Sequence, residues 1–325
     1  MKPISIVMSV YNEPMDWLRG SIESMLRQTF GDFKFIIVND NPDRADIGEL
    51  LEQYGSADGR IRIITNNENI GLTKSLNKAI KAAEGKYIAR MDADDAALPE
   101  RLARQYDFLE KHDDIFLTGT SVKIIDQDGA MRHSAIRRTR HAEIVQDMFG
   151  GRLALYHPTI MFRNQGLLYR EHFETAQDYD FYLNLLSKNK NFANLRDILL
   201  HYRVSNKSIS MNSKRKQVLA GKLALKFYYE RLETGCDSYD RLDFGDEDCL
   251  LRFLGITADQ LEREALRKSI VFALAAGDVE AAMQAFGNYK RCDGHRADKF
   301  MLSLFVNFPR LHGFYRKLRY EVLRF

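Results

Sequence analysis

The chain has 325 residues, of which 45% are hydrophobic and 29% are charged, and its formal net charge is +3 at pH 7. These values are typical of a soluble globular protein, and so small a net charge gives no reason to expect nucleic-acid binding. The three cysteines lie far apart and form no CxxC pair, so we expect reduced thiols and neither a zinc site nor a disulfide framework. No apolar run reaches membrane-spanning length and no cleavable signal precedes the first strand-like segment, which predicts a cytoplasmic protein.

Strand-like and helix-like segments alternate over the first hundred residues. Short apolar runs typical of buried strands occupy 4–10, 33–38, 61–64 and 86–91. Between the last two runs, apolar residues recur at helical spacing, and Gly85 follows as an expected C-terminal cap of that helix. The alternation predicts a mostly parallel central sheet with helices on both faces. Folds of this kind bind their ligands at the carboxyl ends of the strands.

The pattern changes after about residue 100. We expect a helix over 100–111, antiparallel pairing over 115–126, a strand over 153–162 that is interrupted at His157, and a helix over 178–186. Beyond about residue 213 the pattern becomes almost purely helical. The sequence therefore predicts an α/β domain over residues 1–212 and a C-terminal all-α extension over residues 213–325.

Three carboxylates follow an apolar run directly in the segment from Arg90 to Asp95. Like charges at the mouth of a sheet repel one another and lose solvation, so a compensating cation is expected. A hard divalent metal that also carries phosphate oxygens is the usual solution, and it suits an enzyme that handles a diphosphate. On this interpretation Asp94 binds the metal, Asp92 holds a ribose or a metal-bound water, and Asp95 is structural. The alternative is a solvated turn that caps the next helix.

Two other candidates lie near the same predicted edge of the sheet. Asp40 ends an apolar strand among turn-forming residues, and it is either a turn carboxylate or an acceptor for the imide N–H of uracil. Lys74 either reaches a nucleotide or is an ordinary exposed helix lysine. The segment around it is no phosphate loop, because no glycine is adjacent to the lysine and the leading glycine is absent. The chain also has no GxGxxG after a strand, which argues against dinucleotide redox chemistry.

The later candidates are polar residues at the ends of predicted elements. Asp178 and Asp180 open the helix at 178–186. We expect one of them to cap this helix, and the other is a candidate general base for an acceptor hydroxyl. His157 is either a buried hydrogen-bonded residue or an acceptor contact. Arg203 ends a strand-like segment and either has a structural role or faces a phosphate.

The C-terminal stretch 305–320 mixes Phe and Tyr with Arg and Lys. Such a segment either lies on an anionic bilayer or docks on its own domain with a solvated basic face. Pro309 and Gly313 weaken a long helix here. The two interpretations are equally supported by the sequence.

Taken in order, these motifs resemble those of a family 2 glycosyltransferase of the GT-A fold, of the type that builds bacterial surface polysaccharides. The resemblance covers about residues 1–210, and the last third of the chain carries no assignable motif. The matching segments are 9–13, 38–40, 69–72 with 75–77, 89–95, 99–102, 157–159 and 177–180.

The resemblance implies hexosyl transfer from a nucleoside-diphosphate sugar, a UDP-sugar in particular, to a hydroxyl of a glycan or lipid-linked acceptor, with inversion at the anomeric carbon. It assigns Asp92 and Asp94 to a Mn²⁺ or Mg²⁺ ion and Asp178 to the catalytic base. On the donor side it implies contacts from Tyr11, Glu13, Asp40, Lys74, Asp92 and Ala93. On the acceptor or phosphate side it implies His157, Asp180 and Arg203.

Two departures from the family pattern concern donor choice. The second strand ends in Asn39-Asp40-Asn41-Pro42, where many members have Asp-Asp-Gly-Ser. Gln177 precedes the expected base, where many members have Glu. Both departures leave the key aspartates in place, so the resemblance implies retained activity.

The resemblance also assigns roles to the two predicted domains. Residues 1–212 would bind the nucleotide sugar and carry out catalysis, while residues 213–325 would hold the acceptor, contact a membrane or form a homodimer. We favour peripheral attachment to the cytoplasmic face of the membrane. Two other classes are a noncatalytic sugar-nucleotide or glycan-binding protein on this fold and a sugar nucleotidyltransferase. The three aspartates argue against the first class, and the lack of a glycine-rich basic loop after the first strand argues against the second.

Overall fold

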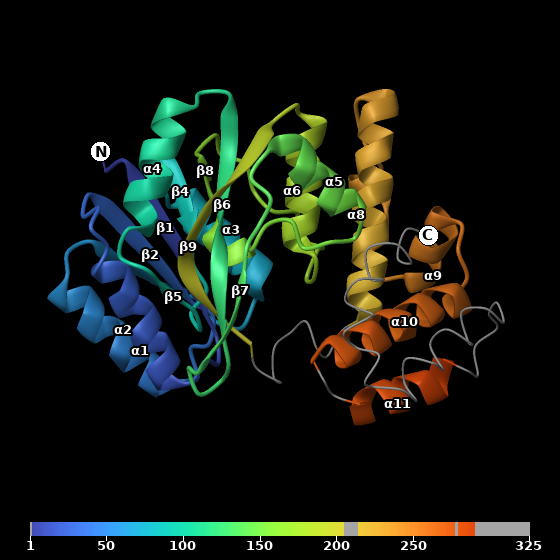
Figure 1. Cartoon of the computed structure of the whole chain (residues 1–325), viewed down its shortest axis with the longest axis horizontal. Helices are drawn as coiled ribbons and strands as arrows, with labels where there is room; N and C mark the ends of the chain where they lie inside the picture. Colours follow the sequence, from blue (N-terminus) through green and yellow to red (C-terminus); the bar gives the residue numbers. More distant parts are fainter. Residues whose placement is uncertain (1, 205–213, 277–278, 290–325) are drawn as a thin grey trace. The chain divides into compact units, whose positions relative to one another are not determined.

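The computed structural model describes residues 2–204, 214–276 and 279–289 (Figure 1). The chain forms two compact units, Met1–Ser205 and Asn206–Phe325, and each has its own hydrophobic core. The predicted domain boundary between residues 212 and 213 lies outside the described residues, and so does the basic and aromatic stretch 305–320.

The first unit begins with a parallel sheet built from alternating strands and helices (Figure 1). Its four strands lie in the order β3-β2-β1-β4, and every neighbouring pair is parallel. The elements are β1 (Ile4–Val10), α1 (Met15–Leu26), β2 (Phe33–Asn39), α2 (Ala45–Ala57), β3 (Ile61–Thr65), α3 (Leu72–Lys81) and β4 (Tyr87–Arg90). The predicted strand–helix alternation is therefore confirmed.

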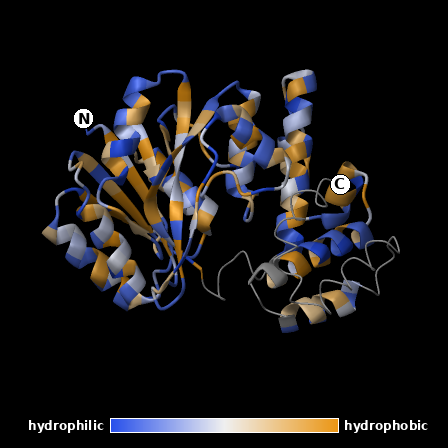
Figure 2. Cartoon of the chain, viewed as in Figure 1, coloured by the Kyte–Doolittle hydropathy of each residue, from blue (hydrophilic) through white to orange (hydrophobic). Residues whose placement is uncertain are grey.

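Both faces of this parallel sheet are covered, which explains why its strands read as continuous apolar runs. Alternate residues of β1 and β2 share one core with the buried faces of α1 and α2. The helix α3 packs on β1 and β2 from the other face, as Figure 1 shows. Figure 2 shows the resulting concentration of hydrophobic residues in these strands.

The sheet continues beyond β4 with mixed pairing in the order β4-β8-β6-β9-β5, and β7 pairs with β6. The predicted change to antiparallel pairing is confirmed, because β6 runs antiparallel to both β7 and β8. The elements are β5 (Ala96–Ala97), α4 (Arg101–Lys111), β6 (Ile115–Ile125), β7 (Met131–Ala135), α5 (His141–Phe149), η1 (His157–Thr159), β8 (Met161–Arg163), α6 (Gln177–Ser187) and β9 (Asn191–Arg203).

Two local expectations were wrong. The predicted strand over 153–162 is formed only at Met161–Arg163, because the chain makes a short 3-10 turn over His157–Thr159; Pro158 has no N–H to donate to a strand ladder. Gly85 does not cap α3, which ends at Lys81 with Ala82 as its C-cap. A side chain at Gly85 would meet the backbone nitrogen of Ser5 at 2.6 Å, so this glycine serves close packing against β1.

The described part of the second unit is helical. It consists of α8 (Lys214–Thr234), η2 (Tyr239–Arg241), α9 (Glu247–Leu254), α10 (Ala258–Ala276) and α11 (Val279–Tyr289). α10 packs against both α8 and α11, and Asp246 caps α9 by accepting a hydrogen bond from the backbone N–H of Cys249 at 3.1 Å. The prediction of a helical extension is therefore confirmed for the described part of this region, while residues 290–325 lie outside the described residues. Among the described residues, no helix combines the length and apolar character that a membrane span requires.

Candidate active site

Three carboxylates lie together directly after β4. Asp92, Asp94 and Asp95, the acidic cluster, each place a carboxylate oxygen within 4.8 Å of the others. The backbone of this segment is held from two sides, because the Ser21 hydroxyl donates to the Asp92 carbonyl at 2.7 Å and Arg203 Nε donates to the Asp94 carbonyl at 2.9 Å. The cluster is therefore a fixed concentration of negative charge at the carboxyl end of the parallel sheet.

The three carboxylates of the acidic cluster destabilise one another's ionised forms. Burial, followed by the charges of Asp92 and Glu13, raises the pKa of Asp94 to about 7. Burial and the two neighbouring aspartates also raise the pKa of Asp95 well above its usual range. Asp95 is 1% exposed, and its Oδ2 atom has no hydrogen-bond partner among the described residues. Carboxylate oxygens are hard donors, so this set fits Mn²⁺ or Mg²⁺.

A buried cation faces the acidic cluster. Arg90, the last residue of β4, is 2% exposed and forms an ion pair with Asp92. Burial opposes its charge, but Asp92 more than compensates, so the pKa of Arg90 is raised. Its Nε atom lacks a hydrogen-bond partner in the described part of the chain. Sequence reasoning missed this residue, although an arginine inside an apolar strand was the available signal.

Asp178 belongs to the same electrostatic group, although it lies on α6. Its Oδ1 atom accepts a hydrogen bond from the backbone N–H of Tyr179 at 2.8 Å. Burial raises the pKa of Asp178, the charge of Arg90 lowers it, and the charge of Asp92 raises it. The three side chains are thus close enough to influence one another's ionisation, although their positions in the sequence are far apart.

Asp180, two residues later, is held differently. It is 1% exposed and forms an ion pair with Arg170, whose Nε donates to Asp180 Oδ2 at 2.9 Å. The expectation that Asp178 or Asp180 caps α6 was wrong, because the N-cap position is Ala176 in the left-handed region and no side chain caps the helix. The carboxylate of Asp180 is bound to Arg170 instead.

Further polar groups lie in the same region as Arg90 and Asp178. His157 Nε2 lies 2.7 Å from the hydroxyl oxygen of Tyr169, and burial followed by the charge of Arg90 lowers the pKa of His157 well below its usual range. Tyr182 lies one helical turn after Asp178 and is 3% exposed. Its hydroxyl has no hydrogen-bond partner among the residues that the structure describes. Burial and, in part, the charge of Asp178 raise the pKa values of Tyr169 and Tyr182, so both tyrosines lie near the Asp178 carboxylate.

Asp40, at the end of β2, is saturated with hydrogen bonds. It is 1% exposed. Its Oδ1 accepts from Asn66 Nδ2 at 2.7 Å and from the Ile70 N–H at 2.9 Å, while Oδ2 accepts from the Gly71 N–H at 2.9 Å. Gly71 has a φ of 87°, a backbone conformation that disfavours other residues. Asp40 thus fixes the turn that begins α3.

The remaining donor-side candidates differ in exposure. Tyr11 is 46% exposed just after β1, and its N–H donates to Glu13 Oε2 at 2.9 Å. Burial raises the pKa of Glu13. Lys74 is exposed on α3, and Ala93 is buried between Asp92 and Asp94.

α3 also carries buried polar residues that sequence reasoning missed. The Thr73 hydroxyl donates to the Phe173 carbonyl at 2.7 Å. Asn77 donates to the Tyr169 carbonyl and accepts from the Tyr169 N–H, both at 2.9 Å. These bonds fasten the segment that leads into α6 onto the parallel half of the sheet. Polar residues at buried helix positions were the signal in the sequence.

Arg203, at the end of β9, supports the acidic cluster from outside. Its N–H donates to Asp95 Oδ1 at 2.7 Å, and its guanidinium donates to the carbonyls of Asp94 and Asp126 at 2.9 and 3.1 Å. The same guanidinium lies 4.7 Å from the centre of the Trp17 ring. Arg203 therefore joins the loop that carries the acidic cluster to α1 and to the β6–β7 turn.

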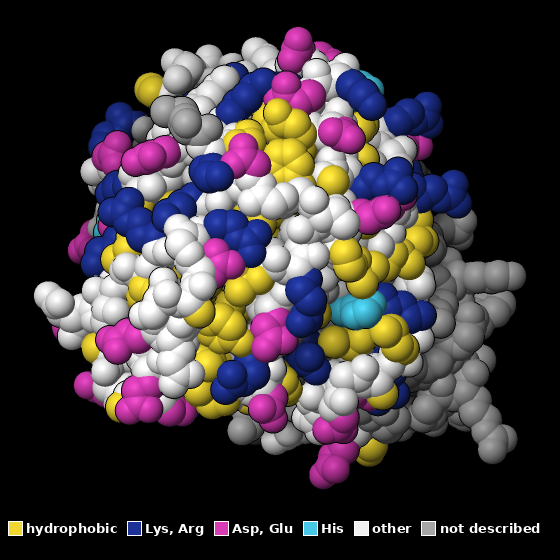
Figure 3. Space-filling view, turned by 90° about the vertical axis from the view of Figure 1, so that its left-hand side faces the viewer, with side chains coloured by type: hydrophobic (Ala, Val, Ile, Leu, Met, Phe, Trp, Pro, Cys, Tyr) yellow, Lys and Arg dark blue, Asp and Glu magenta, His cyan; other side chains and the backbone are white. Residues whose placement is uncertain are grey.

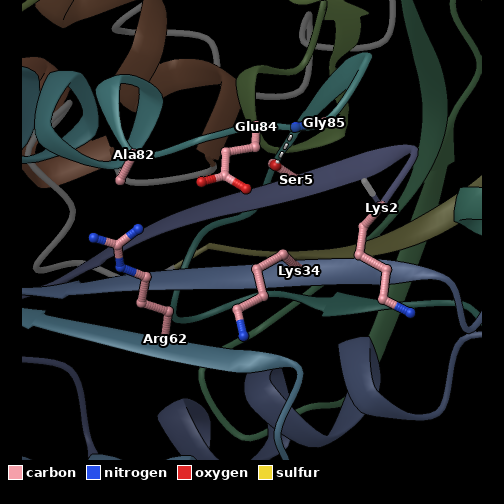
Figure 4. Close-up of a pocket in the computed structure, with 7 residues that line it drawn as sticks. All are labelled: Lys2, Ser5, Lys34, Arg62, Ala82, Glu84 and Gly85. Atoms are coloured by element: carbon pink, nitrogen blue, oxygen red, sulfur yellow. Dashed lines mark hydrogen bonds between the residues drawn. The ribbon is translucent and has the colours of Figure 1, made fainter.

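A separate hollow lies at the opposite, amino end of the parallel strands (Figure 4). It is lined by Lys2, Ser5, Lys34, Arg62, Ala82, Glu84 and Gly85. Lys34 already donates to the Gly59 carbonyl at 2.8 Å, and the Gly85 N–H donates to the Ser5 hydroxyl at 2.9 Å. On the face shown in Figure 3, acidic and basic side chains are interspersed. The hollow shares no residue with the acidic cluster.

Comparisons with known proteins identify relatives of this chain. Residues 5–173 match the family described as Glycosyl transferase family 2. The chain is 36% identical over 239 residues to an uncharacterized glycosyltransferase of Methanocaldococcus jannaschii, a match that covers 72% of this chain and 82% of the relative. It is 32% identical over 257 residues to the O-antigen biosynthesis glycosyltransferase WbnJ of Escherichia coli, which covers 77% and 92% of the two chains.

The fold is also similar to a solved structure. That structure is S. aureus TarS 1–349 in complex with UDP-GlcNAc, with a TM-score of 0.59, 16% sequence identity and coverage of 100% of this chain and 90% of that chain. This likeness supports the predicted α/β fold class. The acidic cluster lies inside the family match, whereas Asp178 lies five residues beyond its end.

Proposed function

Because the chain belongs to glycosyl transferase family 2 and is a glycosyltransferase, we propose that it moves a hexose from a UDP-sugar to a hydroxyl of a glycan or lipid-linked acceptor in polysaccharide biosynthesis. The observation that carries this proposal is the acidic cluster, with oxygens of Asp92, Asp94 and Asp95 within 4.8 Å of one another. The UDP-GlcNAc complex of TarS supports the donor class. The O-antigen role in the name of WbnJ supports the pathway class.

Asp94 and Asp92 are the residues that would hold a Mn²⁺ or Mg²⁺ ion. Such an ion, when bound, supplies Lewis-acid stabilisation of the charge on the departing nucleoside diphosphate. Asp95 and Arg203 orient this segment through the bond from the Arg203 N–H to Asp95 at 2.7 Å. The protein's own contribution here is therefore a preorganised set of oxygens.

The donor's nucleoside is assigned to the ends of β1 and β2. Tyr11 is 46% exposed, so its ring is free to stack on a base, and the Glu13 bond to its N–H holds this turn in place. Asp40 is 1% exposed and shapes the adjacent turn through three hydrogen bonds, so we assign it to positioning the nucleoside site and not to direct contact with the uracil imide. Lys74, exposed on α3, is assigned to the diphosphate, and Ala93 to the sugar side of the loop.

Asp178 is assigned as the general base that removes the acceptor proton during a single inverting displacement. Burial makes its carboxylate a stronger proton acceptor, while the charge of Arg90 keeps the ionised form accessible. His157 is assigned to the acceptor side together with Tyr169. Asp180 holds the start of α6 through Arg170, and so positions the base.

Replacement of Asp178 tests this proposal. Asp178→Asn keeps the shape of the side chain but cannot accept a proton, so we expect donor binding to persist while transfer slows by about 10² to 10⁴-fold. Transfer is measured with purified full-length chain, Mn²⁺, a panel of UDP-sugars and a panel of glycan acceptors, and donor binding by calorimetry. Asp197→Asn, at an exposed position of β9, is the matched control. Undiminished transfer by Asp178→Asn would overturn the assignment.

A further inference from the structure

We infer that Arg90 holds the place of a cation on Asp92 and thereby makes divalent-metal binding depend on the donor's diphosphate. The inference deepens the proposed function and rests on it, because it concerns the same metal site. It gives Arg90 a role of its own, which is to oppose metal binding to the acidic cluster until a diphosphate is present.

Arg90 is a permanent charge in a site that it cannot leave. Its side chain is 2% exposed, and β4 is flanked by β1 on one side and β8 on the other. The backbone is fixed as well, since the Arg90 N–H donates to the Ile160 carbonyl at 2.9 Å and its own carbonyl accepts from Arg101 Nη2 at 2.6 Å. A buried guanidinium remains charged and needs a counter-charge nearby.

That counter-charge is Asp92, a residue that the proposed function also assigns to the metal. Arg90 forms its ion pair with Asp92, and its Nε has no hydrogen-bond partner among the described residues. The guanidinium is therefore held by a direct ion pair with Asp92 and, more weakly, by the charges of Asp95 and Asp178. A second, independent sign of an unfilled ligand position is Asp95 Oδ2, which is buried and unpartnered in the same described region.

Competition for Asp92 follows from this arrangement. A bare divalent ion that binds the acidic cluster must share Asp92 with Arg90 and must lie near a fixed positive charge. A diphosphate adds negative charge at the same place, so it offsets both cations. The site should therefore bind metal weakly alone and tightly together with the nucleotide.

The experiment is a calorimetric titration of the full-length chain with Mn²⁺, first alone and then in the presence of saturating UDP. For the wild type we expect UDP to tighten Mn²⁺ binding at least tenfold. In Arg90→Met, which removes the charge but keeps much of the apolar stem, we expect Mn²⁺ alone to bind at least tenfold more tightly than in the wild type. Arg90→Lys keeps the charge and should behave like the wild type.

Arg62→Met is the matched control, because it removes the same charge from an exposed position at the opposite end of the sheet. Equal Mn²⁺ affinity of the wild type and Arg90→Met would overturn the inference. The inference would also be overturned if UDP left the Mn²⁺ affinity of the wild type unchanged. This part of the test does not depend on the folding of any variant. If the wild type binds no Mn²⁺ even with UDP, the proposed metal site itself fails, and the inference fails with it.

Discussion

Two strand ends at the carboxyl edge of the parallel sheet place aspartates in opposite chemical situations. At the end of β2, both carboxylate oxygens of Asp40 accept hydrogen bonds, three in all. At the end of β4, Asp95 is buried and Asp94 is half-buried, both near like charges, and Asp95 Oδ2 has no hydrogen-bond partner within the described residues. A carboxylate whose oxygens all accept hydrogen bonds stabilises the fold. A group of carboxylates that lacks such partners is available to a ligand.

The largest expected effect comes from the acidic cluster at the end of β4. Asp94→Asn removes one metal-binding charge, so we expect Mn²⁺-supported sugar transfer to fall by about 100-fold or more, in keeping with the several kcal/mol that metal assistance supplies. Because the substitution also relieves like-charge repulsion, the unfolding midpoint should not fall. Asp107→Asn, at an exposed position of α4, is the control. Transfer at the wild-type rate by Asp94→Asn would contradict a ligand-binding role for the acidic cluster.

At the end of β2, a substitution of Asp40 should change the stability of the fold. Asp40→Asn replaces one acceptor with an N–H group that faces another donor, so we expect a loss of about 1 to 3 kcal/mol in the free energy of unfolding. The single tryptophan, Trp17, lies on α1 of the first unit, so its fluorescence reports unfolding of that unit in urea. Asp43→Asn, an exposed neighbour, should leave the midpoint unchanged. If Asp40→Asn lost UDP binding with no change in its urea unfolding midpoint, Asp40 would be a ligand residue, and the difference from the acidic cluster would not hold.

The third expected effect is a pH dependence of stability, which follows from the raised pKa of Asp94 at the end of β4. The pKa of Asp94 is about 7 in the folded chain, against an ordinary value of 3.8. The folded state therefore binds more protons than the unfolded state between about pH 4 and pH 7, so stability in EDTA should decline as pH rises through that window and level off above it. One group contributes at most about 1.4 kcal/mol per pH unit. Urea unfolding at a series of pH values measures the slope, which Asp94→Asn should flatten; an unchanged slope in that variant would contradict the pKa of Asp94.

Local patterns in the sequence were sufficient to predict the sheet and the acidic cluster. Buried parallel strands are apolar on both faces, so β1 and β2 stand out as runs that end in polar residues. The position of Asp92 and Asp94 after such a run placed them at the carboxyl edge. The residues alone left Asp178 and Asp180 as alternatives for the general base, and the resemblance to family 2 selected Asp178.

What the sequence did not reveal depends on contacts between distant segments. The bonds to Asp40 come from Asn66, Ile70 and Gly71, and no pattern around Asp40 indicates them. The burial of Arg90 follows from β8 pairing with β4, a neighbour more than 70 residues later in the chain. The 3-10 turn at His157 could not be predicted from the sequence either, because a proline within an apolar run permits either a strand end or a turn.

The central claim is that Asp92 and Asp94 hold a divalent ion against the donor's diphosphate. Crystals grown with Mn²⁺ and UDP, measured at the manganese absorption edge, test it most directly because the anomalous signal locates the metal. We predict one strong peak in contact with carboxylate oxygens of Asp92 or Asp94 and with the diphosphate. Ordered UDP with no manganese at the acidic cluster, or with manganese bound elsewhere, would contradict the account.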